Sequence, residues 1–83
     1  MDEKEVFRRV REMLAGRQAV PAEEIAWDTR LKEDLEVDSL DLVELSMLVE
    51  EEYGIELFDE QIGALSTVGD VVRLILDNVS ARD

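Results

Sequence analysis

Apolar residues recur at helical spacing in the first part of the chain. Between Asp2 and Ala15 an apolar side chain returns every three or four residues, which is the period of an amphipathic helix. The residues of this stripe are Val6, Phe7, Val10, Met13 and Leu14. Gly16 directly follows the stripe and predicts the end of the helix.

A second helix is predicted to begin at Asp38–Ser39 and to continue to about Tyr53. Both Asp and Ser suit an N-cap, because their side chains can accept hydrogen bonds from free backbone N–H groups. Gly54 is typical of a helix end. The stretch between these signals alternates apolar and acidic residues and contains no basic residue.

The remainder of the chain predicts two further helices. A short one should run from Asp59, which would cap it, to about Ala64. The last helix should follow a cap at Ser66 or Thr67. Its apolar stripe consists of Val68, Val71, Val72, Ile75 and Val79.

A long connection with weak periodicity, from Arg17 to Val37, separates the first two helices. It exceeds an ordinary loop, so we expect a short turn of helix within it and apolar residues that hold it to the core. The expected anchors are Ile25, Trp27, Leu31 and Leu35. The predicted fold is therefore all-α, a small four-helix bundle of three longer helices and one short helix, in one domain over residues 1–83.

The second helix has two apolar arcs at about 100° per residue. One arc should pack into the bundle and consists of Leu42, Leu45, Val49 and Tyr53. The other consists of Leu40, Val43 and Met47 and is interleaved with acidic residues. This second arc is either core against another helix or a recognition surface, and the lack of basic residues around it favours the surface.

The charge of the chain is concentrated in its middle. The net charge is −13, from 22 acidic and 9 basic residues. Residues 33–72 hold 13 of the acids and no Lys or Arg, so the nine remaining acids match the nine bases. Such a region repels nucleic acid and anionic membranes and attracts basic protein partners, although an acidic surface can also serve solubility alone.

Composition excludes several kinds of chemistry. The chain has no His and no Cys, which excludes a Ser–His–Asp triad, a disulfide, and zinc held by imidazole or thiolate. The acidic residues lack the spacing of a calcium-binding loop, so we expect no metal site and no catalytic residue. The sequence contains no signal peptide and no long apolar run, so we expect a cytoplasmic protein without membrane insertion.

Asp38–Ser39 taken alone is typical of a simple helix cap. The position also has a chemical use. A phosphate ester on the Ser39 hydroxyl would lie at a helix N-terminus, where free N–H groups and the helix dipole favour an anion.

The whole pattern resembles the acyl carrier proteins. The resemblance is densest in "DSLDLVELSMLVEEEYGIEL" and continues in "STVGDVVRLI". It implies a four-helix bundle in which Ser39, flanked by Asp38 and Leu40, receives a 4′-phosphopantetheine arm from coenzyme A. The arm would carry acyl groups as thioesters on its own thiol, so the chain needs no Cys and is not itself an enzyme.

The resemblance also implies roles for other residues. The partners would be a phosphopantetheinyl transferase and acyl-transferring and acyl-modifying enzymes with basic patches. Their contacts would be Asp41, Val43, Glu44, Met47, Glu50 and Glu51, with Leu40 beside the attachment site. A cleft for the acyl chain would be lined by Leu45, Val49, Leu57, Ile62, Leu65, Val71, Leu74 and Ile75, although a solid core fits these residues as well.

Two positions depart from the family pattern. Glu36 replaces a common Gly, and Phe58 replaces a common Pro. Fatty-acid, polyketide and related pathways all remain open, and we expect a monomer. The alternative is an acidic interaction or adaptor protein without a prosthetic group, in which Ser39 would be only a helix cap.

Overall fold

Four α-helices and a 3-10 turn make up the structure, a computed structural model that describes residues 2–82 and the side chains of residues 2–80. The elements are α1 (Glu3–Gln18), η1 (Ala22–Glu24), α2 (Ser39–Tyr53), α3 (Asp59–Gly63) and α4 (Val68–Arg82). Within residues 2–82 the chain forms no strand beyond one isolated bridge between Arg30 and Thr67. The all-α prediction, with three longer helices and one short helix, is confirmed.

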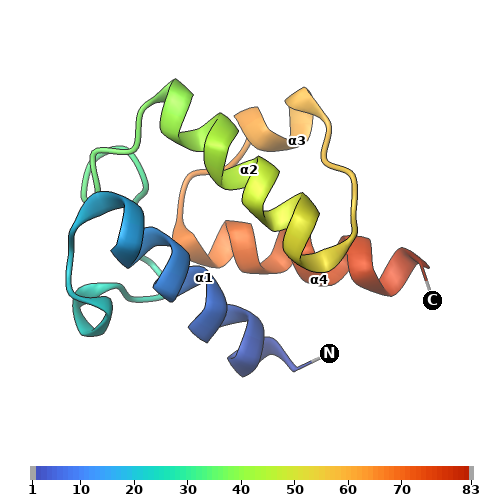
Figure 1. The fold of residues 1–83 in the computed structure, drawn as a ribbon, viewed down its shortest axis with the longest axis horizontal. Helices are drawn as coiled ribbons and strands as arrows, with labels where there is room; N and C mark the ends of the chain where they lie inside the picture. Colours follow the sequence, from blue (N-terminus) through green and yellow to red (C-terminus); the bar gives the residue numbers. More distant parts are fainter. Residues whose placement is uncertain (1, 83) are drawn as a thin grey trace.

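The three longer helices pack around one aliphatic core, and α3 lies beside α2 (Figure 1). α1 makes its main contact with α4, whereas α2 contacts both α3 and α4. The side chains that form the centre of this core are Val6, Val10, Leu14, Leu45, Val49, Val68, Val72 and Ile75. They match the apolar stripes of the sequence, so the helical period predicts the core well.

α1 is longer than its sequence predicts. It continues through Gly16 to Gln18 and ends at Ala19, which has a left-handed backbone with φ of 55°. A glycine costs a helix only about 1 kcal/mol relative to alanine, so contacts of the following turn can offset that cost. The extra turn carries Arg17, whose side chain reaches α2. The predicted stop at Gly16 was therefore wrong.

The long connection between α1 and α2 is held to the core as predicted. Ile25, Leu31 and Leu35 are buried, and η1 supplies the expected short turn of helix. The connection also pairs with the segment that leads into α4, because the Leu31 N–H donates to the Ser66 carbonyl at 2.9 Å. These contacts fix the position from which α2 begins.

Trp27 attaches the same connection to α1 and α4. Its ring meets Phe7 edge-on with centroids 5.6 Å apart, and the Arg73 guanidinium lies 5.6 Å from its centroid. Its carbonyl accepts a hydrogen bond from the Gly69 N–H at 2.8 Å. A Cβ on Gly69 would lie only 2.4 Å from Trp27 Nε1, so this contact requires glycine.

The starts of α3 and α4 use different caps. Phe58, not Asp59, is the N-cap of α3, and its N–H donates to Gln61 Oε1 at 2.9 Å. Asp59 was predicted as the cap but is the first helical residue. At α4 the predicted Thr67 cap is confirmed, because Thr67 Oγ1 accepts from the Asp70 N–H at 3.2 Å. In return, Asp70 Oδ2 accepts from the Thr67 N–H. The same carboxylate accepts from the Ser66 N–H, and this bond is the main cause that holds the pKa of the Asp70 carboxyl below its ordinary value.

Two further findings concern the described part of the chain. None of its helices is long and apolar enough to cross a membrane. In residues 2–80, no three His, Cys, Asp or Glu side chains lie together in an arrangement that could hold a metal ion.

Candidate functional site

Ser39 is the first residue of α2, and Asp38 is its cap. Asp38 Oδ1 accepts from the Asp41 N–H at 2.8 Å, and Asp41 Oδ2 accepts from the Asp38 N–H at 3.2 Å. The N–H of Asp38 is the main cause that lowers the pKa of the Asp41 carboxyl. Among the hydrogen bonds of residues 2–80, none uses the Ser39 hydroxyl, and this side chain is exposed. The helix cap and the exposed serine hydroxyl thus belong to two different residues.

The outer arc of α2 is a surface. Leu40 is 66% exposed, Val43 50% and Met47 60%. Leu48, at 41%, extends this apolar surface and was missed by the sequence analysis. At about 100° per residue it falls beside Glu44, so the helical pattern could have placed it there. These four residues, which we name the outer face, follow Ser39 along one side of α2.

The inner arc of α2 lies against the bundle. Leu42, Leu45 and Val49 are buried, while Tyr53 is half-buried at the end of the helix. Ser46 is also buried, and its hydroxyl donates to the Val43 carbonyl at 2.7 Å. The packing on this side therefore fixes which residues α2 presents on the other.

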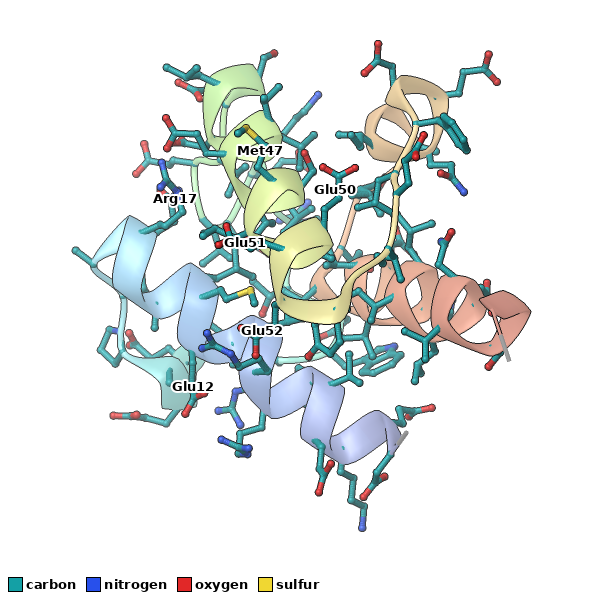
Figure 2. The ribbon with its side chains drawn as sticks, turned by 45° about the vertical axis from the view of Figure 1, so that its right-hand side comes forward. Glu12, Arg17, Met47, Glu50, Glu51 and Glu52 are labelled. Atoms are coloured by element: carbon teal, nitrogen blue, oxygen red, sulfur yellow. The ribbon has the colours of Figure 1, made fainter. Side chains whose placement is uncertain are left out.

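Two predicted recognition acids already have a basic partner. Arg17 at the end of α1 forms ion pairs with Asp41, at 3.6 Å between Nη2 and Oδ1, and with Glu44. Figure 2 shows Arg17 reaching from α1 toward α2. Residues 33–72 contain no basic residue, so the fold brings a distant cation to the acidic helix.

Glu50 and Glu51 are neighbours in sequence but have different surroundings. Glu51 is exposed on the side of α2 that faces α1, whereas Glu50 points toward the connection to α3 (Figure 2). Glu50 Oε2 accepts from the Leu57 N–H at 2.8 Å. Glu50 was predicted as a partner contact, and in the structure one oxygen of its carboxylate also helps to hold the α2–α3 connection.

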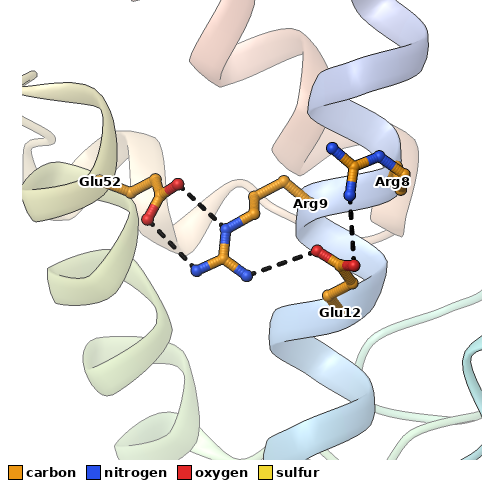
Figure 3. Close-up of polar contacts among 4 residues, drawn as sticks. All are labelled: Arg8, Arg9, Glu12 and Glu52. Atoms are coloured by element: carbon orange, nitrogen blue, oxygen red, sulfur yellow. Dashed lines mark hydrogen bonds and ion pairs between the residues drawn. The ribbon is translucent and has the colours of Figure 1, made fainter.

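The far end of α2 is tied to α1 by a second ion pair. Arg9 Nε and Nη2 donate to the two carboxylate oxygens of Glu52 at 3.0 and 3.2 Å, and Arg9 also pairs with Glu12 (Figure 3). The hydrogen bond from Arg9 lowers the pKa of the Glu52 carboxyl. Neither residue was predicted to take part in this contact. Sequence offers little signal for it, since the two residues are far apart along the chain.

The predicted acyl-cleft residues come together between α2, α3 and α4. Leu45, Val49, Val71 and Ile75 are buried there. Leu57 is also buried. The remaining members are half-buried and pack against the edge of this core: Ile62, Leu65 and Leu74. All are aliphatic, and in this structure their side chains are part of the packed core.

The backbone conformation at Glu36 gives a reason for the Gly that the family commonly has at this position. Its backbone has φ of 54°, a left-handed conformation that glycine adopts without strain and other residues adopt at a cost. The position two residues before Asp38 thus favours the Gly that the family commonly has. Glu36 itself is exposed, so its carboxylate adds charge beside Ser39.

Comparison with known proteins agrees with this geometry. Residues 8–75 match the family described as the phosphopantetheine attachment site. An acyl carrier protein of Saccharopolyspora erythraea is 45% identical over 80 residues, which cover 96% of this chain and 84% of the relative. An acyl carrier protein of Rubrobacter xylanophilus is 38% identical over 81 residues, which cover 98% of this chain and 100% of the relative.

Solved structures show the same fold. An acyl carrier protein from Enterococcus faecalis aligns with a TM-score of 0.81 and 29% identity, covering 94% of this chain and 99% of the other. One from Thermotoga maritima aligns with a TM-score of 0.86 at 24% identity, covering 100% and 96%, and supports the fold alone.

The chain belongs to the acyl carrier protein family. It is a carrier of acyl groups and not a catalyst, and its prosthetic group is 4′-phosphopantetheine. As a member of this family it interacts with phosphopantetheinyl transferase and with biosynthetic enzymes. The residues present fit the group: an exposed serine hydroxyl stands at the start of a 15-residue helix, with an apolar surface beside it.

Proposed function

We propose that Ser39 is the residue that bears the arm, and that the loaded chain delivers acyl groups to enzymes of fatty-acid, polyketide or related biosynthesis. The observation that carries the assignment is that the helix cap and the exposed hydroxyl at the start of α2 belong to different residues. Asp38 supplies the cap, so the exposed Ser39 hydroxyl has no structural task. This arrangement weighs against the adaptor alternative, in which Ser39 would serve as the cap.

Attachment requires one bond to form and one to break. The Ser39 oxygen would bond to the phosphorus of coenzyme A next to the pantetheine, and the phosphoanhydride bond would break. Adenosine 3′,5′-bisphosphate would leave, and a base of the transferase would accept the serine proton. Once bound, the arm supplies a terminal thiol that carries acyl groups as thioesters. The dipole at the start of α2 favours the new phosphodiester.

The outer face and its acids form the proposed contact for partners. Leu40, Val43 and Met47 offer exposed apolar area next to Ser39. Asp41, Glu44 and Glu51 would attract basic groups on a transferase or a biosynthetic enzyme. Glu50 contributes by holding the α2–α3 connection, since its carboxylate accepts the Leu57 N–H. We further propose that the chain, as one domain, acts as a monomer in the cytoplasm.

The proposed acyl site is the aliphatic layer between α2, α3 and α4. Its edge residues Ile62, Leu65 and Leu74 are only half-buried, and α3 is a helix of five residues. A short helix with few buried contacts is the element that can move at the lowest cost. We infer that an acyl chain would enter beside α3 and contact Leu45 and Val49 last.

Incubation of the purified chain with coenzyme A, magnesium and a broad-specificity phosphopantetheinyl transferase tests the proposal. Intact mass should show one added arm on the wild type and none on Ser39→Ala. The matched control is Ser66→Ala, because Ser66 is also exposed but lies before α4. It should be modified like the wild type.

Ser39→Ala should change the free energy of unfolding by less than about 0.5 kcal/mol, because the substitution lies on the surface and removes no helix cap. A mass increase on Ser39→Ala, or none on the folded wild type, would refute the assignment.

A further inference from the structure

Arg17 occupies the acids at the start of the proposed contact surface. It extends from the last turn of α1 and pairs with both Asp41 and Glu44, which flank the outer face near Ser39. All three side chains remain partly open to solvent. An arginine with two carboxylates is the arrangement that a basic partner residue would itself form with these acids.

The cation beside the start of α2 comes from outside the acidic region of the chain. Because residues 33–72 lack Lys and Arg, only a residue from outside this region can neutralise α2. Arg17 is able to do so because α1 continues through Gly16. Had α1 ended at Gly16, Arg17 would not stand on this helical turn.

Arg17 also borders a surface hollow. The hollow has a volume of about 260 Å³ and is lined by Glu44, Met47, Leu48 and Glu51. Because the Arg17 side chain is partly exposed and both ion pairs lie at the surface, the guanidinium can leave the two acids without opening the core. Its departure would expose Asp41 and Glu44 together with the apolar wall of the hollow.

The Arg9–Glu52 ion pair provides an internal comparison. It also joins α1 to α2, but at the end of α2 remote from Ser39, and Glu52 is not among the proposed partner contacts. Arg9 therefore joins the helices without covering the outer face. Arg17 joins them at the place where a partner would bind.

We propose that Arg17 is a built-in competitor for the basic residues of partner enzymes. This inference rests on the proposed function, because it assumes that partners bind the acids of α2. A partner that docks must replace Arg17 with its own cation at Asp41 and Glu44. Partners with a strong basic group there are accepted, and weakly basic proteins are rejected, so Arg17 sets a threshold for recognition.

The test is the rate of arm transfer by the same transferase, followed by intact mass at low ionic strength. Arg17→Gln should lower KM about two- to fivefold, the range expected for one partly exposed ion pair, with kcat unchanged. Arg17→Lys keeps the charge but replaces the planar guanidinium with a compact ammonium, so its KM should lie between those of wild type and Arg17→Gln.

Two controls separate competition from other effects. Arg8→Gln makes the same change in net charge, but Arg8 pairs with Glu12 on α1, so KM should stay near that of wild type. Arg9→Gln breaks the other tie between the helices and should also leave KM nearly unchanged. In an Asp41→Asn/Glu44→Gln background, Arg17→Gln should have no further effect on KM.

Each outcome bears on the inference. A KM for Arg17→Gln equal to that of Arg8→Gln, or above that of wild type, would overturn it while leaving the proposed function intact. A folded wild type that accepts no arm would overturn the proposed function and this inference with it. Thermal melts of each variant verify that KM is compared between folded proteins.

Discussion

The inner and outer faces of α2 belong to one helix but have opposite tasks. The inner face buries Leu42, Leu45 and Val49 in the core, whereas the outer face leaves Leu40 and Met47 exposed. Both faces are apolar, so hydrophobicity alone does not distinguish them. The two faces differ because acidic residues accompany the outer face, whereas the core of the bundle covers the inner face. An apolar residue of α2 therefore serves stability or recognition according to its side of the helix.

Truncation of one leucine on the inner face should have the largest effect on stability. Leu45→Ala removes a fully buried side chain and should reduce the free energy of unfolding by about 2–5 kcal/mol. Met47→Ala on the outer face should change it by less than about 0.5 kcal/mol, and should instead raise KM for the transferase. Urea titration and transfer kinetics check the pair. Equal stability losses would contradict the division into two faces.

The boundary between the faces can be tested with two adjacent glutamates. Glu50→Gln weakens the charged acceptor of the Leu57 N–H and should cost about 1 kcal/mol of stability. Glu51→Gln makes the same change in charge at an exposed position, so stability should hold while KM rises. Thermal unfolding and transfer kinetics measure both effects. If Glu51→Gln were the more destabilising variant, Glu50 would not be holding the connection.

The smallest expected effect on stability concerns Glu36, which precedes α2. Glu36→Gly relieves the left-handed backbone and should stabilise the fold by about 1 kcal/mol or less. Glu36→Gln removes the charge but keeps the strain, so it serves as the control. A gain in melting temperature for Gln as large as for Gly would mean that charge, and not backbone strain, limits stability at this position.

Sequence predicted the helices and both faces of α2 because each depends on local periodicity. The core stripe of α4 was found for the same reason. The anchors Ile25 and Leu31 were predicted instead from the length of the connection, which is too long to lie free of the core. Helix ends were harder, since Gly16 is followed by a turn whose ion pairs come from tertiary structure. The cap of α3 was misplaced by one residue, because Gln61 serves the backbone of Phe58 and makes a polar cap at Asp59 unnecessary.

At the candidate site, Ser39 and three residues of the outer face were predicted, whereas Leu48 and the ion pairs of the acids were not. The count of charges assigned the whole negative charge to residues 33–72. In the folded chain, Arg17 forms ion pairs with Asp41 and Glu44. Arg9 forms an ion pair with Glu52. Pairings between distant residues depend on how α1 crosses α2, and no local pattern encodes that crossing.

The position of Trp27 provides an optical probe that is separate from the functional surface. It is the one tryptophan of the chain, and its ring contacts lie on α1 and α4. Its emission should therefore report how the long connection docks, while substitutions along the outer face leave the spectrum of the folded state unchanged. Folding and partner binding can then be recorded in the same cuvette, with tryptophan emission for one and a dye on the arm for the other.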